Sequence, residues 1–272
     1  MVVQHRRGRG AVAVAAAVVS VAALAGCSGQ EADARPGEDP AKAVRGAARV
    51  LGAAGTARAR TVMETASGGT RVTIRGEGGY DFARRLGQLR VVLPKDAAGA
   101  DEHRPVTEVL APGALYMKNR GAGVPADKWV RVDTTTLADG NLVTGGATDP
   151  WAAAELLRGA RGVTLVGREE LAGVAVRHYR GTADLGAAAR AADARSRATL
   201  AAAAKGFSTD AVPFDAYLDD QGRLRKVRHR FSFGNRERAV AVVSTTLLYD
   251  FGAPVRVALP RGRDIYSGRI RA

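Results

Sequence analysis

Few side chains in this sequence belong to the types that catalyse reactions or bind metals. The 272 residues include one cysteine, Cys27, and three histidines beyond the N-terminal leader, namely His103, His178 and His229. A single thiol excludes an intramolecular disulfide framework and a structural zinc site built on several thiolates. The carboxylates of Asp219-Asp220 stand directly before Gln-Gly, where such residues form a turn. Because nucleophile-elbow, metalloprotease and P-loop motifs are also absent, we predict no catalytic residue, no cofactor and no metal site.

The composition narrows the class of protein further. Hydrophobic residues make up 46% of the chain, which excludes wholesale disorder, and the formal net charge is +14. Aromatic residues are only 5%, which argues against a platform that stacks nucleic-acid bases. The length is sufficient for one large domain with a buried core.

The N-terminus has the layout of an export signal. Arg6, Arg7 and Arg9 form a basic region, and the uncharged Ala and Val stretch that follows, Ala11 to Leu24, has 14 residues. A membrane-spanning helix needs about 20 residues, so this stretch is too short to span a bilayer. It ends in Leu24-Ala25-Gly26 directly before the only cysteine, and we interpret residues 1–26 as a removable signal peptide.

The segment Leu24-Ala25-Gly26-Cys27 resembles the lipobox of bacterial lipoproteins. The resemblance implies cleavage after Gly26, a diacylglyceryl group on the Cys27 sulfur and acylation of the new amine. Multiple acyl chains anchor a protein stably, so the protein is expected on the outer face of the cytoplasmic membrane, where it meets no nucleic acid. An ordinary secretory signal with an incidental cysteine, and twin-arginine export through Arg6-Arg7, are the alternatives. Residues 27–40 lack apolar periodicity and are predicted to form a flexible tether.

The rest of the chain, residues 41–272, is predicted to form one domain made mainly of antiparallel strands. Helical periodicity covers 41–54, Asp149-Pro150 begins a helix that runs to about 158, and alanine-rich 186–205 is a third. Strand-like runs of alternating character fill the remaining segments: about 61–65, 71–75, 86–93, 106–110, 114–118, 129–132, 163–166, 174–179, 214–218, 224–233, 238–249 and 255–259. Strands and helices do not alternate, which excludes a doubly wound sheet. We predict an α+β fold: a curved antiparallel sheet, or half-barrel, with a few helices on its concave face.

The order of several motifs after the lipobox-like segment resembles a known group. These motifs are Leu115-Tyr116-Met117-Lys118, Lys128 to Asp133, the helix at Asp149-Pro150, Gly173 to Tyr179, Tyr217 to Val227, and Tyr249 to Val255. Together they are similar to the LppX/LprAFG group of actinobacterial lipoproteins, which are related in fold to the lipoprotein carrier LolA. The resemblance covers roughly residues 41–262. It implies a half-barrel with an apolar cavity that binds or carries acylated lipids or glycolipids. Of the functional residues, only Cys27 carries over by position.

Residues 224–233 are predicted to form a strand with two different faces. Lys226, Arg228 and Arg230 share one face by alternation, whereas the other face carries Val227, His229, Phe231 and Phe233. The basic face is either a solvated surface or a site that attracts anionic lipid headgroups.

The apolar face, together with Phe214 and Leu218 of the preceding strand, lines either a lipid pocket or an ordinary closed core. Two functions therefore remain open. One is a lipoprotein that holds an acyl-chain ligand. The other is a non-catalytic envelope protein with a filled core and a basic face toward a membrane or protein partner.

Overall fold

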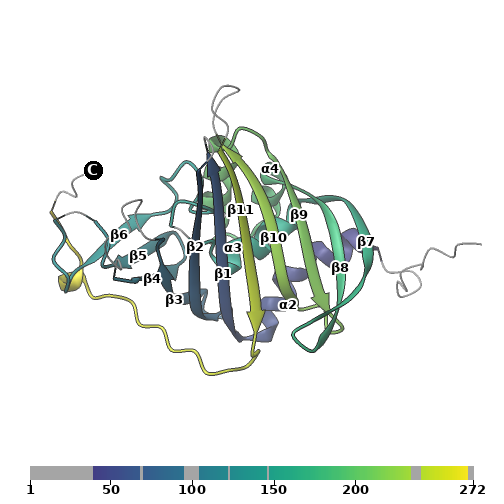
Figure 1. The fold of residues 1–272 in the computed structure, drawn as a ribbon, viewed down its shortest axis with the longest axis horizontal. Coiled ribbons are helices and arrows are strands. Elements are labelled where there is room, and N and C mark those ends of the chain that lie inside the picture. The colour runs from purple at the N-terminus through teal and green to yellow at the C-terminus, as the bar shows by residue number, and fades with distance from the viewer. Residues whose placement is uncertain are drawn as a thin grey trace, which may run out of the picture. The chain divides into compact units, whose positions relative to one another are not determined.

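Eleven antiparallel strands form a single open sheet in the computed structural model of this chain. Their spatial order is β6-β5-β4-β3-β2-β1-β11-β10-β9-β8-β7. Strand β11, the last in sequence, therefore lies beside β1, the first, and joins the two halves of the sheet (Figure 1). The predicted fold class is confirmed. The strands are β1 (Thr56–Ser67), β2 (Thr70–Asp81), β3 (Leu86–Val92), β4 (Val106–Ala111), β5 (Ala114–Lys118), β6 (Trp129–Asp133), β7 (Ala160–Leu171), β8 (Val174–Asp184), β9 (Ala211–Asp219), β10 (Leu224–Phe233) and β11 (Val240–Tyr249).

The structure describes residues 39–67, 70–94, 104–121, 123–145, 147–233 and 240–268. The chain divides into two compact units, Met1–Glu31 and Ala32–Ala272, and the described residues belong to the second. Cys27, the predicted signal peptide and nearly all of the predicted tether lie outside the described residues, as does His103.

Short helices cover one face of the sheet, which we call the inner face. Figure 1 shows them behind β1, β11, β10 and β9, and their contacts with β7, β8 and β10 agree with that view. Asp149 caps α3 by accepting a hydrogen bond from the Trp151 N–H at 2.7 Å, and Pro150 occupies the first turn, as predicted. The helices are α1 (Pro40–Arg45), α2 (Ala47–Ala54), α3 (Pro150–Leu156), α4 (Leu185–Ala191) and α5 (Arg197–Gly206), with short 3₁₀ helices η1 (Leu157–Gly159) and η2 (Gly262–Asp264).

Two helices predicted as continuous are each divided in two. The helix expected at 41–54 is interrupted at Gly46, between α1 and α2. The helix expected at 186–205 is interrupted by residues 192–196 between α4 and α5. There Asp193 Oδ1 accepts hydrogen bonds from the N–H groups of Arg195 and Ser196, which holds the chain in a turn. Local side-chain bonds of this kind compete with helix formation, and alanine content alone does not reveal them.

The hairpin of β7 and β8 is much longer than predicted. The strand expected at 163–166 extends to 171, so residues 167–171 belong to β7 and only Ala172-Gly173 forms the turn. Strand β7 lies at the edge of the sheet, where polar and charged side chains are favoured because they discourage pairing with other molecules. The polar composition therefore marked an edge strand and not a loop.

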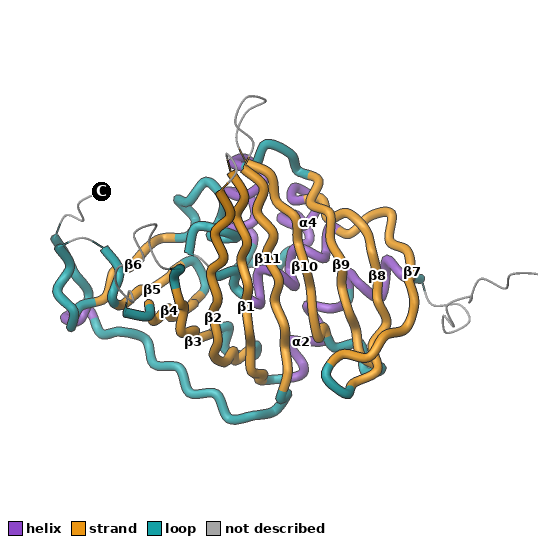
Figure 2. The backbone as a smooth tube through the Cα atoms, in the orientation of Figure 1, coloured by secondary structure: helices purple, strands orange, loops and turns teal. Residues whose placement is uncertain are grey.

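The C-terminal segment 250–268 packs on the outer face of the sheet, opposite the helices. Residues 255–259, predicted as a strand, are extended but pair with no strand among the described residues. Val257 joins a small outer core with Leu86 and Val109. The teal tube in Figure 2 shows this segment passing from the end of β11 to β6, where Ile265 bridges to Trp129.

Candidate functional site

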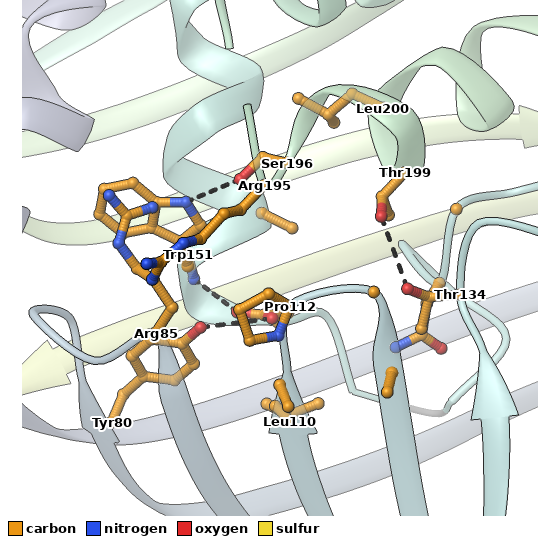
Figure 3. A pocket seen from close by; sticks show the side chains of 17 residues that line it. Tyr80, Arg85, Leu110, Pro112, Thr134, Trp151, Arg195, Ser196, Thr199 and Leu200 are labelled. Atoms are coloured by element: carbon orange, nitrogen blue, oxygen red, sulfur yellow. Dashed lines mark hydrogen bonds between the residues drawn. The ribbon is translucent and has the colours of Figure 1, made fainter. Parts of the chain in front are cut away.

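A pocket opens between the inner face of the sheet and the helices, beside the turn that joins β4 to β5. Its apolar walls include Leu110, Trp151 and Leu200, while Arg85 and Arg195 supply positive charge. Figure 3 shows Pro112 of the β4–β5 turn facing Trp151 and the start of α5 across this space. The empty space is about 530 Å³ when counted out to the open mouth, and the interior part is about 40 Å³. That interior admits a few water molecules, so an alkyl chain enters only if the helices and the sheet move apart.

Arg85 lies at one side of the pocket mouth, where its side chain joins the β2–β3 turn to the α4–α5 connection. Its guanidinium lies 3.3 Å from the centre of the Trp151 ring and donates to Asp193 Oδ2 at 2.5 Å. The Trp151 indole N–H donates to Ser196 Oγ at 3.0 Å (Figure 3). Burial raises the pKa of the Asp193 carboxyl, but the hydrogen bond and charge of Arg85, together with backbone N–H groups of Arg195 and Ser196, outweigh burial, so the pKa is lowered. Arg85 also holds a left-handed backbone with φ of 60°, a sparsely populated conformation for a residue other than glycine.

The irregular segments 139–145 and 147–149, which we call the cap, cover part of the inner face. Asp139 organises it by accepting hydrogen bonds from the N–H groups of Val143 and Thr144 at 2.8 and 2.7 Å. One side of the cap lines the pocket through Asn141. Its other side contacts the middle of the sheet, because Thr148 Oγ1 lies 2.5 Å from Ser244 Oγ on β11. The cap therefore separates the pocket from the centre of the inner face.

Several polar side chains lie buried at the centre of the inner face, which is unusual for a filled core. Thr61, Thr246 and His229 are each at most 2% exposed. Thr61 Oγ1, Thr246 Oγ1 and His229 Nε2 have no hydrogen-bond partner among the described residues. Each such group costs about 1–3 kcal/mol, which is large against a net stability of about 5–15 kcal/mol. Desolvation by burial lowers the pKa of His229 to about 3, so the ring is uncharged near neutral pH.

Glu108 is a second unusual feature of the inner face. It lies on β4 between Leu89 of β3 and Met117 of β5 in the strand register, and it is 0% exposed. Neither carboxylate oxygen has a hydrogen-bond partner within the described ranges. Burial raises the pKa of Glu108 to about 8, although the charge of Arg120 opposes this. The carboxyl group is therefore mainly protonated at neutral pH.

The residues predicted to line a lipid pocket lie on the inner face but away from the pocket. Phe214, Leu218, Val227 and Phe231 are all at most 2% exposed and belong to the main hydrophobic core. Phe231 stacks on Phe207 with 5.1 Å between the ring centres. The side chain of Phe233 lies outside the described residues. Alternation correctly separates the buried from the exposed positions, but in this conformation the strand lines a closed core.

The predicted basic residues lie on the outer face, as alternation requires. Arg230 Nη2 donates to Asp215 Oδ2 at 2.7 Å, and the Lys226 ammonium lies 4.7 Å from the Tyr217 ring centre. Asp215 also contacts His178, whose other ring nitrogen lies 2.7 Å from a Glu169 oxygen. Asp215 and Glu169 therefore neutralise part of the basic face. Alternation within one strand did not predict these contacts, because the partners lie on other strands.

Beyond β11, which is uncharged, basic residues recur on three more strands, β1, β2 and β3. In the register, Lys226 lies in one row with Arg60 and Arg90, and Arg228 lies in the next row with Arg75. Arg60 is paired with Glu77 at 3.1 Å. These arginines, with Val62 and Val92, line an open groove on β1, β2 and β3. The sequence signal for this patch was the alternation of arginine in these strands, but joining it to β10 required knowledge of the strand order.

Within the described part of the chain, no group of three or more histidine, cysteine, aspartate or glutamate side chains is arranged to hold a metal ion. No described helix combines the length and apolar character needed to cross a membrane.

No protein-family model matches the sequence, and no curated protein matches it. Among solved structures, the lipoprotein LppX of Mycobacterium tuberculosis is similar, with a TM-score of 0.43 and 12% identity over 81% of this chain and 100% of that chain. LprF of Mycobacterium bovis gives 0.40 and 12% identity over 82% and 97%. A LolA superfamily protein of Nitrosomonas europaea gives 0.34 and 11% identity over 78% and 94%. The first two are lipoproteins of the group that the order of the sequence motifs resembles.

Proposed function

We propose that this chain is an exported, non-catalytic lipoprotein that binds an acyl-chain lipid or glycolipid between the inner face of its sheet and the helices. The observation that carries the proposal is the pocket beside the β4–β5 turn. It combines apolar walls with the positive charge of Arg85 and Arg195 at its mouth. A lipid with a polar or anionic headgroup presents the complementary chemistry: alkyl chains gain about 0.8 kcal/mol per buried CH₂, while the headgroup stays near the arginines.

Uptake on this proposal requires the helix layer to lift from the sheet. Alanine occupies five of the eleven buried positions of α3, α4 and α5, namely Ala153, Ala154, Ala188, Ala189 and Ala203. Such positions make fewer dispersion contacts than larger side chains and cost less to separate. The contact between Arg85 and Asp193, and the contact between the cap and Ser244, must break first.

The test is native mass spectrometry of the chain from residue 28 onward, purified without detergent from an actinobacterial host. This form contains the whole compact unit Ala32–Ala272. We expect additional mass that organic extraction resolves into discrete lipids. Ala152→Phe, which places a ring in the pocket lining, should reduce the bound lipid, whereas Ala194→Phe, exposed on the α4–α5 connection, should not. A protein that stays free of lipid after incubation with the host's membrane lipids refutes the proposal.

Anchoring through Cys27 and attraction of the outer face to anionic headgroups complete the proposal. Lys226, Arg228 and Arg230, with the arginines of β1 to β3, place positive charge on four strands, with the uncharged β11 between β10 and β1. Near an anionic membrane each basic residue contributes about 1 kcal/mol, and salt weakens the attraction. We expect the unlipidated chain to bind vesicles containing phosphatidylglycerol, and the double change Lys226→Gln and Arg228→Gln to weaken binding. Equal binding to vesicles of phosphatidylcholine alone excludes this role.

A second function, a non-catalytic envelope interaction protein, is favoured by one specific observation. The interior of the pocket is only about 40 Å³, and Phe214, Leu218, Val227 and Phe231 form a closed core. On this alternative the basic outer face binds a membrane or an envelope protein, and the inner face never opens. The mass spectrometry experiment separates the two functions, because a filled core takes up no lipid under any loading condition.

A further inference from the structure

The buried polar side chains at the centre of the inner face form a connected row, which we call the polar row. Thr61 on β1 pairs directly with Thr246 on β11. Ser244 lies two residues before Thr246 on β11, on the same face, and it pairs with His229 on β10. Directly opposite side chains in a sheet have their Cβ atoms about 4.5–5.5 Å apart. Three adjacent strands therefore place three hydroxyl groups and an imidazole in one patch.

Ser244 is satisfied, whereas the other three members of the row are not. Thr148 Oγ1 donates to the Leu142 carbonyl at 2.6 Å, so its single hydrogen is used and Ser244 Oγ must donate to it. Thr61 Oγ1, Thr246 Oγ1 and His229 Nε2 have no such partner within the described ranges. Buried polar atoms in folded proteins are nearly always paired, so unpaired ones call for an explanation.

The row is joined to the pocket by the cap. Asn141 lines the pocket, and its Oδ1 is likewise buried without a partner among the described residues. From there the cap runs to Ala147 and Thr148, which lie over Gly76 and Ser244 at the row. Gly76 has no side chain beside Thr61 Oγ1, and a Cβ there would lie 2.5 Å from that oxygen. The pocket mouth and the polar row therefore lie on either side of the cap.

We propose that the polar row binds the uncharged ester group of an acylated lipid, whose alkyl chain extends along the inner face. This inference rests on the function proposed above. Threonine hydroxyls donate to a carbonyl oxygen, and neutral imidazole donates or accepts. The inner-face positions next to the row carry Ala59, Met63, Val227, Phe231 and Leu248, none of which is charged. A free carboxylate would be buried there without a counter-charge, which is costly, whereas an ester carries no charge to desolvate.

The test measures binding of methyl palmitate and of palmitate to the chain from residue 28 onward. Thr61→Val and Thr246→Val each remove one hydroxyl and keep the side-chain shape. Thr245→Val, on the opposite face of β11, is the matched control. We expect methyl palmitate to bind more tightly than palmitate. Each inner-face change should weaken methyl palmitate binding about fivefold, as expected for one hydrogen bond, and the control should leave it unchanged.

A spectroscopic measurement makes the outcome specific to hydrogen bonding. The infrared carbonyl band of bound methyl palmitate should lie at lower frequency than in an alkane solvent, and Thr61→Val with Thr246→Val should return it toward the solvent value. Binding that is equal in all variants, with a free-ester band, overturns the inference and leaves the lipid-binding function intact. Tighter binding of palmitate than of its ester also overturns it. Failure of both probes to bind any form of the protein refutes the lipid-binding function itself.

Discussion

Replacing Glu108 with glutamine should remove a large part of the pH dependence of this protein's stability. Glu108 is fully buried on the inner face of β4, and its carboxylate oxygens have no hydrogen-bond partner among the described residues. Burial raises its pKa from an ordinary value of 4.5 to about 8. The folded protein therefore keeps a proton at pH values where the unfolded chain has lost it.

The sign and size of the effect follow from linkage. Because the folded pKa is above the unfolded one, the stabilising contribution is fully present below pH 4.5 and is lost as pH rises to about 8. Each pH unit inside this window changes the free energy of unfolding by about 1.4 kcal/mol. Between pH 5 and pH 8, Glu108 should thus lower the free energy of unfolding by about 3.5 kcal/mol, with the fall tapering near each end.

The assay is urea unfolding at pH 5 and pH 8 for the unchanged protein and for Glu108→Gln. The difference between the two pH values is compared between the proteins, so that titration of other groups cancels. Glu170→Gln, exposed on the edge strand β7, is the control and should behave like the unchanged protein. If Glu108→Gln loses as much stability between pH 5 and pH 8 as the unchanged protein, Glu108 is ionised in the folded state and the reasoning is wrong.

Three further perturbations test other parts of the structure. Burial lowers the pKa of His229 from 6.5 to about 3, so the contribution of neutral His229 to the free energy of unfolding is present above pH 6.5 and is lost as pH falls. In the same unfolding assay, His229→Gln should therefore reduce the loss of unfolding free energy between pH 7 and pH 5 by about 2 kcal/mol. Phe231→Ala should lower the free energy of unfolding by about 3–5 kcal/mol, because the ring is buried against Phe207, and a loss below about 1 kcal/mol would mean that this core is loosely packed. Val257→Ala should cost about 1.5 kcal/mol and speed proteolysis of the C-terminal segment, and unchanged cleavage would show that the small outer core does not hold that segment.

Much of the local structure could be predicted from the sequence because its causes are local. The alternation in Leu224–Phe233 separates the basic side chains from Val227 and Phe231, since successive side chains of a strand point to opposite faces. Asp149 and Pro150 identify the start of α3 through the capping bond and the missing N–H. Predictions were wrong where a local signal was overridden, as at residues 192–196, where the side chain of Asp193 ends the helical run.

The candidate site itself was decided by the tertiary structure. Thr61 and Thr246 are far apart in sequence and meet only because β11 pairs with β1. Arg85, Trp151 and Asp193 come from three separate segments, namely the β2–β3 turn, α3 and the α4–α5 connection. The sequence by itself determined the antiparallel α+β class and the two faces of β10, because these depend on neighbouring residues. Only the tertiary structure decided which polar groups lose contact with water, since burial depends on how distant segments pack together.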